Sequence, residues 1–320
     1  MEKEEVISHM DLIEKNYKII FSNLNKQEEY NIGKTQNKVC RFCGLNEEQT
    51  TFNTVAHAIP ECLGNKQIIC LDECDNCNRD FANNIEDHLA AITLPYRVIN
   101  MIEGKRKTPS YQTQDQKSKI NIEDAENKFM RIISREDSEF VVLDEKNKSF
   151  RIEYDLPTHI PAAAYKTLVK MALSIMSNEQ IKDFSILNSW IQDKDHTKNL
   201  MNPLNVLMTV IPGINPFKET TVFLLKKYTE REEYPDSTFI LAFGNVMYQI
   251  ILPSDNEIKE KASKKTLLKF LTPFEVNWNL GKPTHRMLDW SQNTKVKLCK
   301  QFMDFGYDQI IKLDPKSIEL

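Results

Sequence analysis

Two Cys-x-x-Cys pairs constrain this chain more than any other feature. Cys40 and Cys43 form the first pair, and Cys74 and Cys77 form the second. Thiolates two residues apart can reach one ion from a tight turn, and two such pairs complete a tetrahedral Zn²⁺ shell. Two disulfides, or four unrelated buried cysteines, are the alternative. We expect the acidic and polar N-terminus not to act as a signal peptide, so the paired spacing favours a structural Zn²⁺.

The residues between the pairs predict a small ββα unit. A β-branched and aromatic run at Thr50–Val55 is typical of a short strand, with His57 at its end, and Gln67–Leu71 reads as a second strand. Asp75 or Asn76 is a suitable cap for the helix that follows. The apolar positions of that helix, at helical spacing, are Phe81, Ile85, Leu89 and Ile92. We therefore expect two strands and a helix that a zinc ion staples together.

The motif resembles one known family. The phrase AHAIPE, followed by DECDNCN and by F-x-x-x-I-E, is similar to the HNH, or ββα-metal, endonucleases whose ββα unit lies between two CxxC knuckles. Within that family it looks most like the HNH domains of bacterial anti-phage effectors. The resemblance covers about residues 38–95, under a fifth of the chain. It implies a nuclease fold for this segment only.

The resemblance also implies roles for two residues. His57 has the position of the general base that activates water against a phosphodiester, and an imidazole can take a proton near neutral pH. Asn78 directly follows the last cysteine, where the family carries a ligand of the catalytic ion. A hard divalent ion, Mg²⁺ or Mn²⁺, prefers such oxygen donors. Taken alone, His57 could equally be a structural histidine, and Asn78 a helix cap.

The sequence departs from the family pattern just before His57. Many members carry Asp, Glu or His there as a second ligand, whereas this chain has Ala56. Glu61 and Glu86 are the candidate replacements, and Asn78 and Glu86 are eight residues apart, on one face of the expected helix. Glu86 could equally form a salt bridge. A further alternative is a domain that keeps the fold without catalysis.

Composition and charge limit the class of protein. The chain has 320 residues, 41% hydrophobic and 28% charged, and a net charge of −4. These values are ordinary for a globular protein, and no apolar run approaches the ~18 residues of a membrane span. The acidic balance argues against a protein that coats DNA constitutively, but it is compatible with a nuclease that is held inactive until it is triggered. We expect a cytoplasmic protein with no membrane partner.

The rest of the chain predicts a second, larger domain. We expect an N-terminal helical arm at 1–37 with a helix over 2–25, the HNH domain at 38–102, a linker at 103–119, and a C-terminal α+β domain at 120–320. A basic triplet in the linker, Lys105, Arg106 and Lys107, is a weak candidate for phosphate contact. The alternative for this triplet is a solvated linker.

The C-terminal domain is expected to be mainly antiparallel. Short strands are predicted at 129–134, 139–143 and 149–154 as a meander, and again at 206–211 and 220–225. Helices are predicted from Pro161 and over 178–191, and helical spacing recurs at 265–271 and 288–307. A hairpin over 239–252 has Gly244 and Asn245 as a two-residue loop, of type II′ or type I′. This domain could sense a signal, oligomerise or bind an activating partner or ligand.

The sequence thus predicts an α+β protein with a zinc-stapled HNH domain followed by a larger, mainly antiparallel α+β domain. Its expected function is metal-dependent endonuclease cleavage of DNA in regulated anti-phage defence, with RNA as an open alternative substrate. One catalytic metal per site usually serves one strand, so we expect a homodimer or larger assembly. The alternative function is a non-catalytic zinc module that binds nucleic acid or protein, and Ala56 is its best support.

Overall fold

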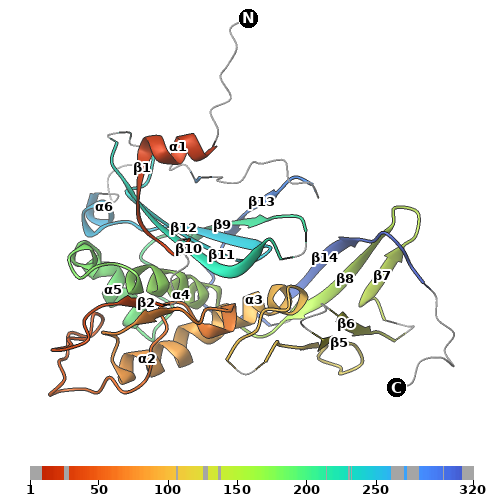
Figure 1. Cartoon of the computed structure of the whole chain (residues 1–320), viewed down its shortest axis with the longest axis horizontal. Helices are drawn as coiled ribbons and strands as arrows, with labels where there is room; N and C mark the ends of the chain where they lie inside the picture. Colours follow the sequence, from red (N-terminus) through yellow and green to blue (C-terminus); the bar gives the residue numbers. More distant parts are fainter. Residues whose placement is uncertain are drawn as a thin grey trace, which may run out of the picture.

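The computed structural model describes residues 9–24, 29–105, 107–124, 129–135, 138–213, 215–229, 231, 233–260, 270–271, 281–297 and 299–311 (Figure 1). The helices are α1 (His9–Asn16), α2 (Asp75–Phe81), α3 (Asp87–Ile99), α4 (Pro161–Ser174), α5 (Ser185–Gln192) and α6 (Asp255–Glu260), with the 3-10 turns η1 (Glu61–Leu63) and η3 (Gln180–Phe184) and the π-helical turn η2 (Ala82–Glu86). The strands are β1 (Tyr17–Ser22), β2 (Tyr30–Ile32), β3 (Ile68–Cys70), β4 (Tyr111–Gln112), β5 (Lys119–Asp124), β6 (Phe129–Ile133), β7 (Val141–Asp144), β8 (Ser149–Leu156), β9 (Asn205–Val210), β10 (Phe217–Lys227), β11 (Ser237–Gly244), β12 (Val246–Ile251), β13 (Thr284–Asp289) and β14 (Cys299–Gly306).

An antiparallel sheet of six strands lies at the centre, in the order β1-β10-β11-β12-β9-β13. Its middle is the predicted hairpin, in which Phe243 pairs with Val246 and leaves Gly244 and Asn245 as the loop. Gly244 has a φ of +57°, whereas Asn245 is not among the described non-glycine residues with positive φ. A type II′ turn requires positive φ at its first loop position only, so the hairpin uses the first of the two predicted turn types.

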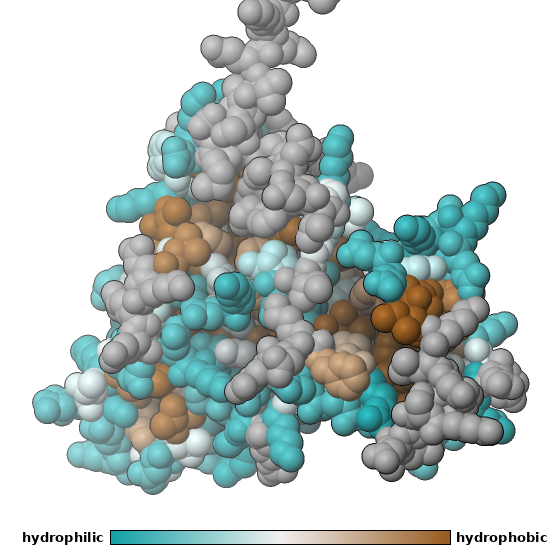
Figure 2. Space-filling view, turned by 45° about the vertical axis from the view of Figure 1, so that its right-hand side comes forward, coloured by the Kyte–Doolittle hydropathy of each residue, from teal (hydrophilic) through white to brown (hydrophobic). Residues whose placement is uncertain are grey.

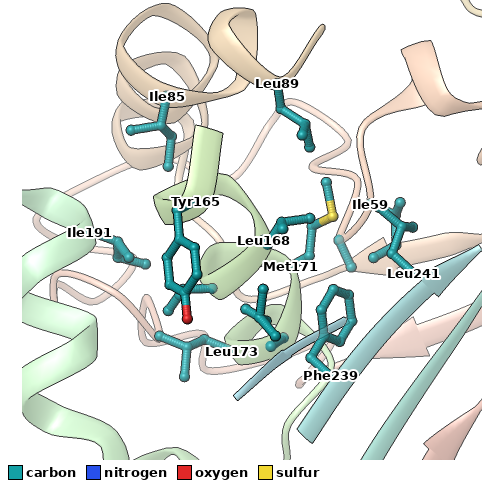
Figure 3. Close-up of a cluster of buried hydrophobic side chains, with 14 of the residues drawn as sticks. Ile59, Ile85, Leu89, Tyr165, Leu168, Met171, Leu173, Ile191, Phe239 and Leu241 are labelled. Atoms are coloured by element: carbon teal, nitrogen blue, oxygen red, sulfur yellow. The ribbon is translucent and has the colours of Figure 1, made fainter. Parts of the chain in front are cut away.

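Helix α4 lies between this sheet and the helices of residues 38–102, called here the cysteine-rich segment (Figures 1 and 3). Every one of its residues is buried, and Pro161 occupies its first turn, as the sequence predicts. Leu168 and Met171 pack in one hydrophobic core with Ile85 and Leu89 of the cysteine-rich segment and with Phe239 of the sheet (Figure 3). The cysteine-rich segment therefore shares its core with the rest of the chain.

A second group of strands forms a separate lobe at the right of Figure 1. Two three-stranded sheets, β14-β8-β7 and β4-β5-β6, enclose a core with the C-terminal half of α3. The predicted strands at 129–154 are present, but they do not form one meander, because β6 pairs with β5 and β7 pairs with β8. Hydrophobic side chains reach the surface of this lobe (Figure 2), and Leu143 and Phe302 are among its exposed residues.

Two helix predictions are wrong. The helix expected over 2–25 is described only from His9 and ends at Asn16, and Tyr17–Ser22 forms β1. This aromatic and β-branched stretch pairs with β10, where the sheet edge supplies backbone partners that a helix would forgo. The region 288–307, where helical spacing was expected, contains the end of β13 and the whole of β14. Residues along β14 alternate between exposed and half-buried, as in a strand. Most of 265–271 lies outside the described residues.

The fold class is confirmed at the level of a mixed α+β protein with mostly antiparallel sheets. In the described ranges one strand pair is parallel, β2 with β3. Among these same residues, the helices are all too short or too polar to cross a bilayer.

Candidate functional site

The four predicted cysteines meet at one point. The Sγ atoms of Cys40, Cys43, Cys74 and Cys77 all lie within 4.8 Å of one another. Cys40 and Cys43 lie on a tight turn in which the Gly44 N–H donates to the Cys40 carbonyl at 2.8 Å. Cys74 caps α2, and its Sγ accepts from the Cys77 N–H at 3.5 Å. The first turn of the helix thus brings the second pair onto the first.

The electrostatics of the cluster fit a cation. A hydrogen bond from the Cys77 thiol, together with donors on the backbone, lowers the pKa of Cys40 to about 4, and the same hydrogen bond raises the pKa of Cys77. Burial raises the pKa of Cys43 to about 11. These shifts favour the thiolate form of Cys40, and a divalent ion would favour the deprotonated form of the other sulfurs as well. Four convergent sulfurs of this kind suit a metal such as Zn²⁺.

Arg41 ties this cluster to α4. Its Nε donates to Asp72 Oδ1 at 2.6 Å, and both side chains are almost fully buried. Its Nη1 donates to the carbonyls of Leu173 and Ser174, the last two residues of the helix, and of Met176 just beyond it, at 2.8–2.9 Å. The first knuckle thus caps the C-terminus of the central helix with a positive charge.

His57 lies on a short antiparallel pairing with β3. It forms an isolated bridge with Ile69, flanked by hydrogen bonds from Ala58 N–H to the Ile68 carbonyl at 3.0 Å and from Cys70 N–H to the Ala56 carbonyl at 2.8 Å. Helix α2 follows β3, but no strand lies between β2 and β3 in the described residues, so the first strand of the predicted ββα unit is reduced to this single bridge. The strand predicted at Thr50–Val55 is wrong, because the pairing begins only at Ala56.

Asp75 explains why the preceding residues do not pair. Its carboxylate accepts hydrogen bonds from the Thr51 hydroxyl and from the N–H groups of Asn53 and Thr54. The loop is thereby held against the start of α2, and its backbone donors are no longer free for a strand partner. Cys74, rather than Asp75 or Asn76, is the N-cap.

The His57 imidazole is half-buried, with 20% of its side chain exposed. Its Nδ1 lies 3.9 Å from Glu61 Oε2, and Lys105 Nζ lies 4.0 Å from the same oxygen. Burial lowers the pKa of His57 below its ordinary value of 6.5; Lys170 and Lys105 act in the same direction, and Glu61 and Glu86 oppose it. The ring is therefore neutral at pH 7 and able to accept a proton.

Lys170 of α4 is a residue that sequence reasoning missed. Its side chain is fully buried, and its Nζ lies 3.0 Å from Glu73 Oε2 and 3.2 Å from Glu86 Oε1. The same Nζ donates to the His57 carbonyl at 3.2 Å. Burial alone would lower the pKa of Lys170, but the two carboxylates raise it overall, so the ammonium is charged. Two lysines four residues apart in the otherwise uncharged α4 were the signal that could have found it.

The candidate ligands of a catalytic ion are only partly gathered. Asn78 lies half-buried in α2, and its side-chain amide makes no hydrogen bond to another described residue. Glu86 ends the π-helical turn η2 and is 17% exposed, in an ion pair with Lys170. Among the described residues, the four cysteines are the only group of three or more His, Cys, Asp or Glu side chains whose ligand atoms converge within 4.8 Å. The donors near His57 therefore do not form a closed ligand set.

Of the basic triplet at 105–107, one residue lies near His57. Lys105 is exposed and lies 4.0 Å from Glu61, as described above, and Lys107 is also exposed. Arg106 lies outside the described residues. Within the expected linker, Tyr111 is buried and stacks on Phe140. The end of this segment therefore packs into the second lobe.

The fold and the cluster together define a mixed α+β protein with a four-cysteine site suited to a metal such as zinc. Neither a protein-family model nor a curated protein nor a solved structure matches the chain.

Proposed function

We propose that the protein is a metal-dependent endonuclease of the HNH type that hydrolyses phosphodiester bonds in DNA. The observation that carries the proposal is His57, a half-buried imidazole with a lowered pKa, on a short strand pairing between the two halves of a four-cysteine cluster. A neutral imidazole that keeps partial exposure can accept the proton of an attacking water at cellular pH.

Two residues of the helical segment support this chemistry. Asn78 and Glu86 carry oxygen donors of the kind that hard divalent ions prefer, and both belong to the continuous helical segment that follows the second cysteine pair. A bound Mg²⁺ or Mn²⁺ would polarise the phosphate and stabilise the leaving oxygen. Lys105 offers an exposed positive charge near His57, which would attract the nucleic-acid backbone.

The setting of the reaction extends the proposal. A zinc site of thiolates suits a reducing cytoplasm, and the resemblance of the motif suggests regulated anti-phage defence. The larger part of the chain would then hold the activating ligand or partner, or the homodimer contact. Size-exclusion chromatography at micromolar concentration tests the assembly, and a plain monomer would contradict it.

The decisive experiment compares two histidine variants in plasmid cleavage with added Mg²⁺ or Mn²⁺, both before and after incubation with lysate from phage-infected cells. His57→Ala should lose about 10²–10⁴-fold of the cleavage rate, the usual contribution of a general base. His285→Ala, which removes an exposed histidine of β13, is the matched control and should cleave like the wild type. Equal rates for the two variants would exclude His57 as the base.

A second candidate function is a zinc-stabilised module that binds nucleic acid or protein without cutting. It is favoured by the open arrangement of donors around His57 and by Ala56, which is buried and provides no ligand. Gel-shift assays with DNA and RNA separate the two functions, because a binding module should retain full affinity in His57→Ala and show no cleavage in any variant.

A further inference from the structure

Lys170 connects the central helix to the candidate site. It lies on α4, outside the cysteine-rich segment, and none of its side chain is exposed. Its three polar neighbours all come from that segment: the Glu73 carboxylate, the Glu86 carboxylate and the His57 carbonyl, at 3.0, 3.2 and 3.2 Å from Nζ. One ammonium therefore contacts three places in the segment: His57, Glu73 next to Cys74, and Glu86 at the end of η2.

The carboxylates of Glu73 and Glu86 differ in their exposure to solvent. Glu73 is completely buried beside Lys170, and neither of its oxygens has a hydrogen-bond donor of good geometry in the described part of the chain. Glu86 uses Oε1 for Lys170 and keeps 17% of its side chain exposed. Glu86 is thus held by Lys170 from the buried side, and part of its side chain stays in contact with solvent.

Lys166 shows that a buried lysine in α4 can be satisfied without touching this site. It is also fully buried, one turn before Lys170, and its Nζ donates to the Asp193 carbonyl at 2.7 Å. A buried ion pair seldom stabilises a fold more than an apolar pair of the same shape would. The contacts of Lys170 with Glu86 and His57 therefore call for a reason beyond packing.

We propose that Lys170 is a positioning residue that fixes the Glu86 carboxylate beside His57, so that Glu86 supplies the divalent-metal ligand that Ala56 cannot. The inference rests on the proposed nuclease function and adds to it a residue from the larger part of the chain. Orientation of a ligating carboxylate by an outer partner is a general feature of metal sites.

The test compares Lys170→Met with the matched control Lys166→Met in zinc-loaded protein. Binding of Mn²⁺ is followed by electron paramagnetic resonance, and plasmid cleavage is measured across Mn²⁺ concentrations. Loss of an outer partner typically costs 10–100-fold in metal affinity or activity, so Lys170→Met should raise the half-saturating Mn²⁺ concentration by about that factor. Lys166→Met should leave it unchanged, with the zinc content of both variants intact.

Two further variants keep the result interpretable. Lys170→Met leaves two carboxylates without their cation, so Lys170→Met/Glu73→Gln restores the charge balance of the buried pair and should show the same weak Mn²⁺ binding. Glu86→Gln, which retains the pair of Lys170 with Glu73, should match it. Unchanged Mn²⁺ affinity in Glu86→Gln, or equal affinities in the Lys170 and Lys166 variants, would overturn the inference and leave the nuclease proposal standing. A wild type that neither binds Mn²⁺ nor cleaves would instead refute the proposed function, and the role of Lys170 would fall with it.

Discussion

Replacing Arg41 by methionine is the sharpest test of how the cysteine cluster is joined to the rest of the fold. Methionine keeps much of the length of the side chain but removes the guanidinium. Asp72, with only 2% of its side chain exposed, would lose the partner that lies 2.6 Å away. The carbonyls of Leu173, Ser174 and Met176 would lose their shared donor at the end of α4.

The expected loss of stability is large. Removing one partner of a buried ion pair costs about 3–5 kcal/mol, because the remaining charge is left uncompensated. The lost hydrogen bonds to the helix end belong to the same group and do not add in full, so we expect about 4–5 kcal/mol in all. Arg151→Met is the matched control. Its pair with Asp304, at 2.7 Å and 3.1 Å, is exposed, and water screens it.

The assay is urea unfolding of zinc-loaded protein at pH 7, followed by tryptophan fluorescence, since Trp190 and Trp290 are both buried. Arg41→Met should lower the free energy of unfolding far more than Arg151→Met. The double variant Arg41→Met/Asp72→Asn should recover part of the loss, because no buried charge then lacks a partner. A loss in Arg41→Met no greater than that of the exposed control would refute the reasoning.

Three further predictions concern zinc, pH and the central hairpin. Cys74→Ser should abolish zinc binding in metal analysis and lower the melting temperature of the whole protein. Structural zinc contributes on the order of 10 kcal/mol to the stability of a small zinc unit, and this cluster shares its core with α4. An unchanged melting curve would contradict this prediction. Burial lowers the pKa of Lys166 from 10.5 to about 8, so above pH 8 the folded state binds fewer protons than the unfolded state. The free energy of unfolding should therefore rise with pH by up to about 1.4 kcal/mol per pH unit. Lys166→Met should lack this slope in urea unfolding between pH 7.5 and 9.5. Gly244→Ala would place a Cβ 2.6 Å from Asn100 at a positive φ and should cost about 1–3 kcal/mol in the same assay, whereas a neutral effect would contradict the described turn.

Local patterns in the sequence were sufficient for much of the fold. Alternation and turn chemistry predicted the hairpin of β11 and β12, and the apolar run after Pro161 predicted α4, because these signals lie within a few residues of one another. The same reasoning failed at Tyr17–Ser22, where an edge of the central sheet outweighs the helical spacing. It also failed at Thr50–Val55, where the side chain of Asp75 takes up the backbone donors.

For the candidate site, too, the sequence predicted some features and only the tertiary structure revealed others. Cysteine spacing determined the four-sulfur cluster, because two residues between thiolates allow one tight turn to present both, and the place of His57 between the two pairs can be read from the sequence. Only the tertiary structure brought Lys170 to the His57 carbonyl and Arg41 to the end of α4, because these residues lie on segments that meet through a shared hydrophobic core. Such encounters depend on how layers pack, which the spacing of residues along one segment does not encode.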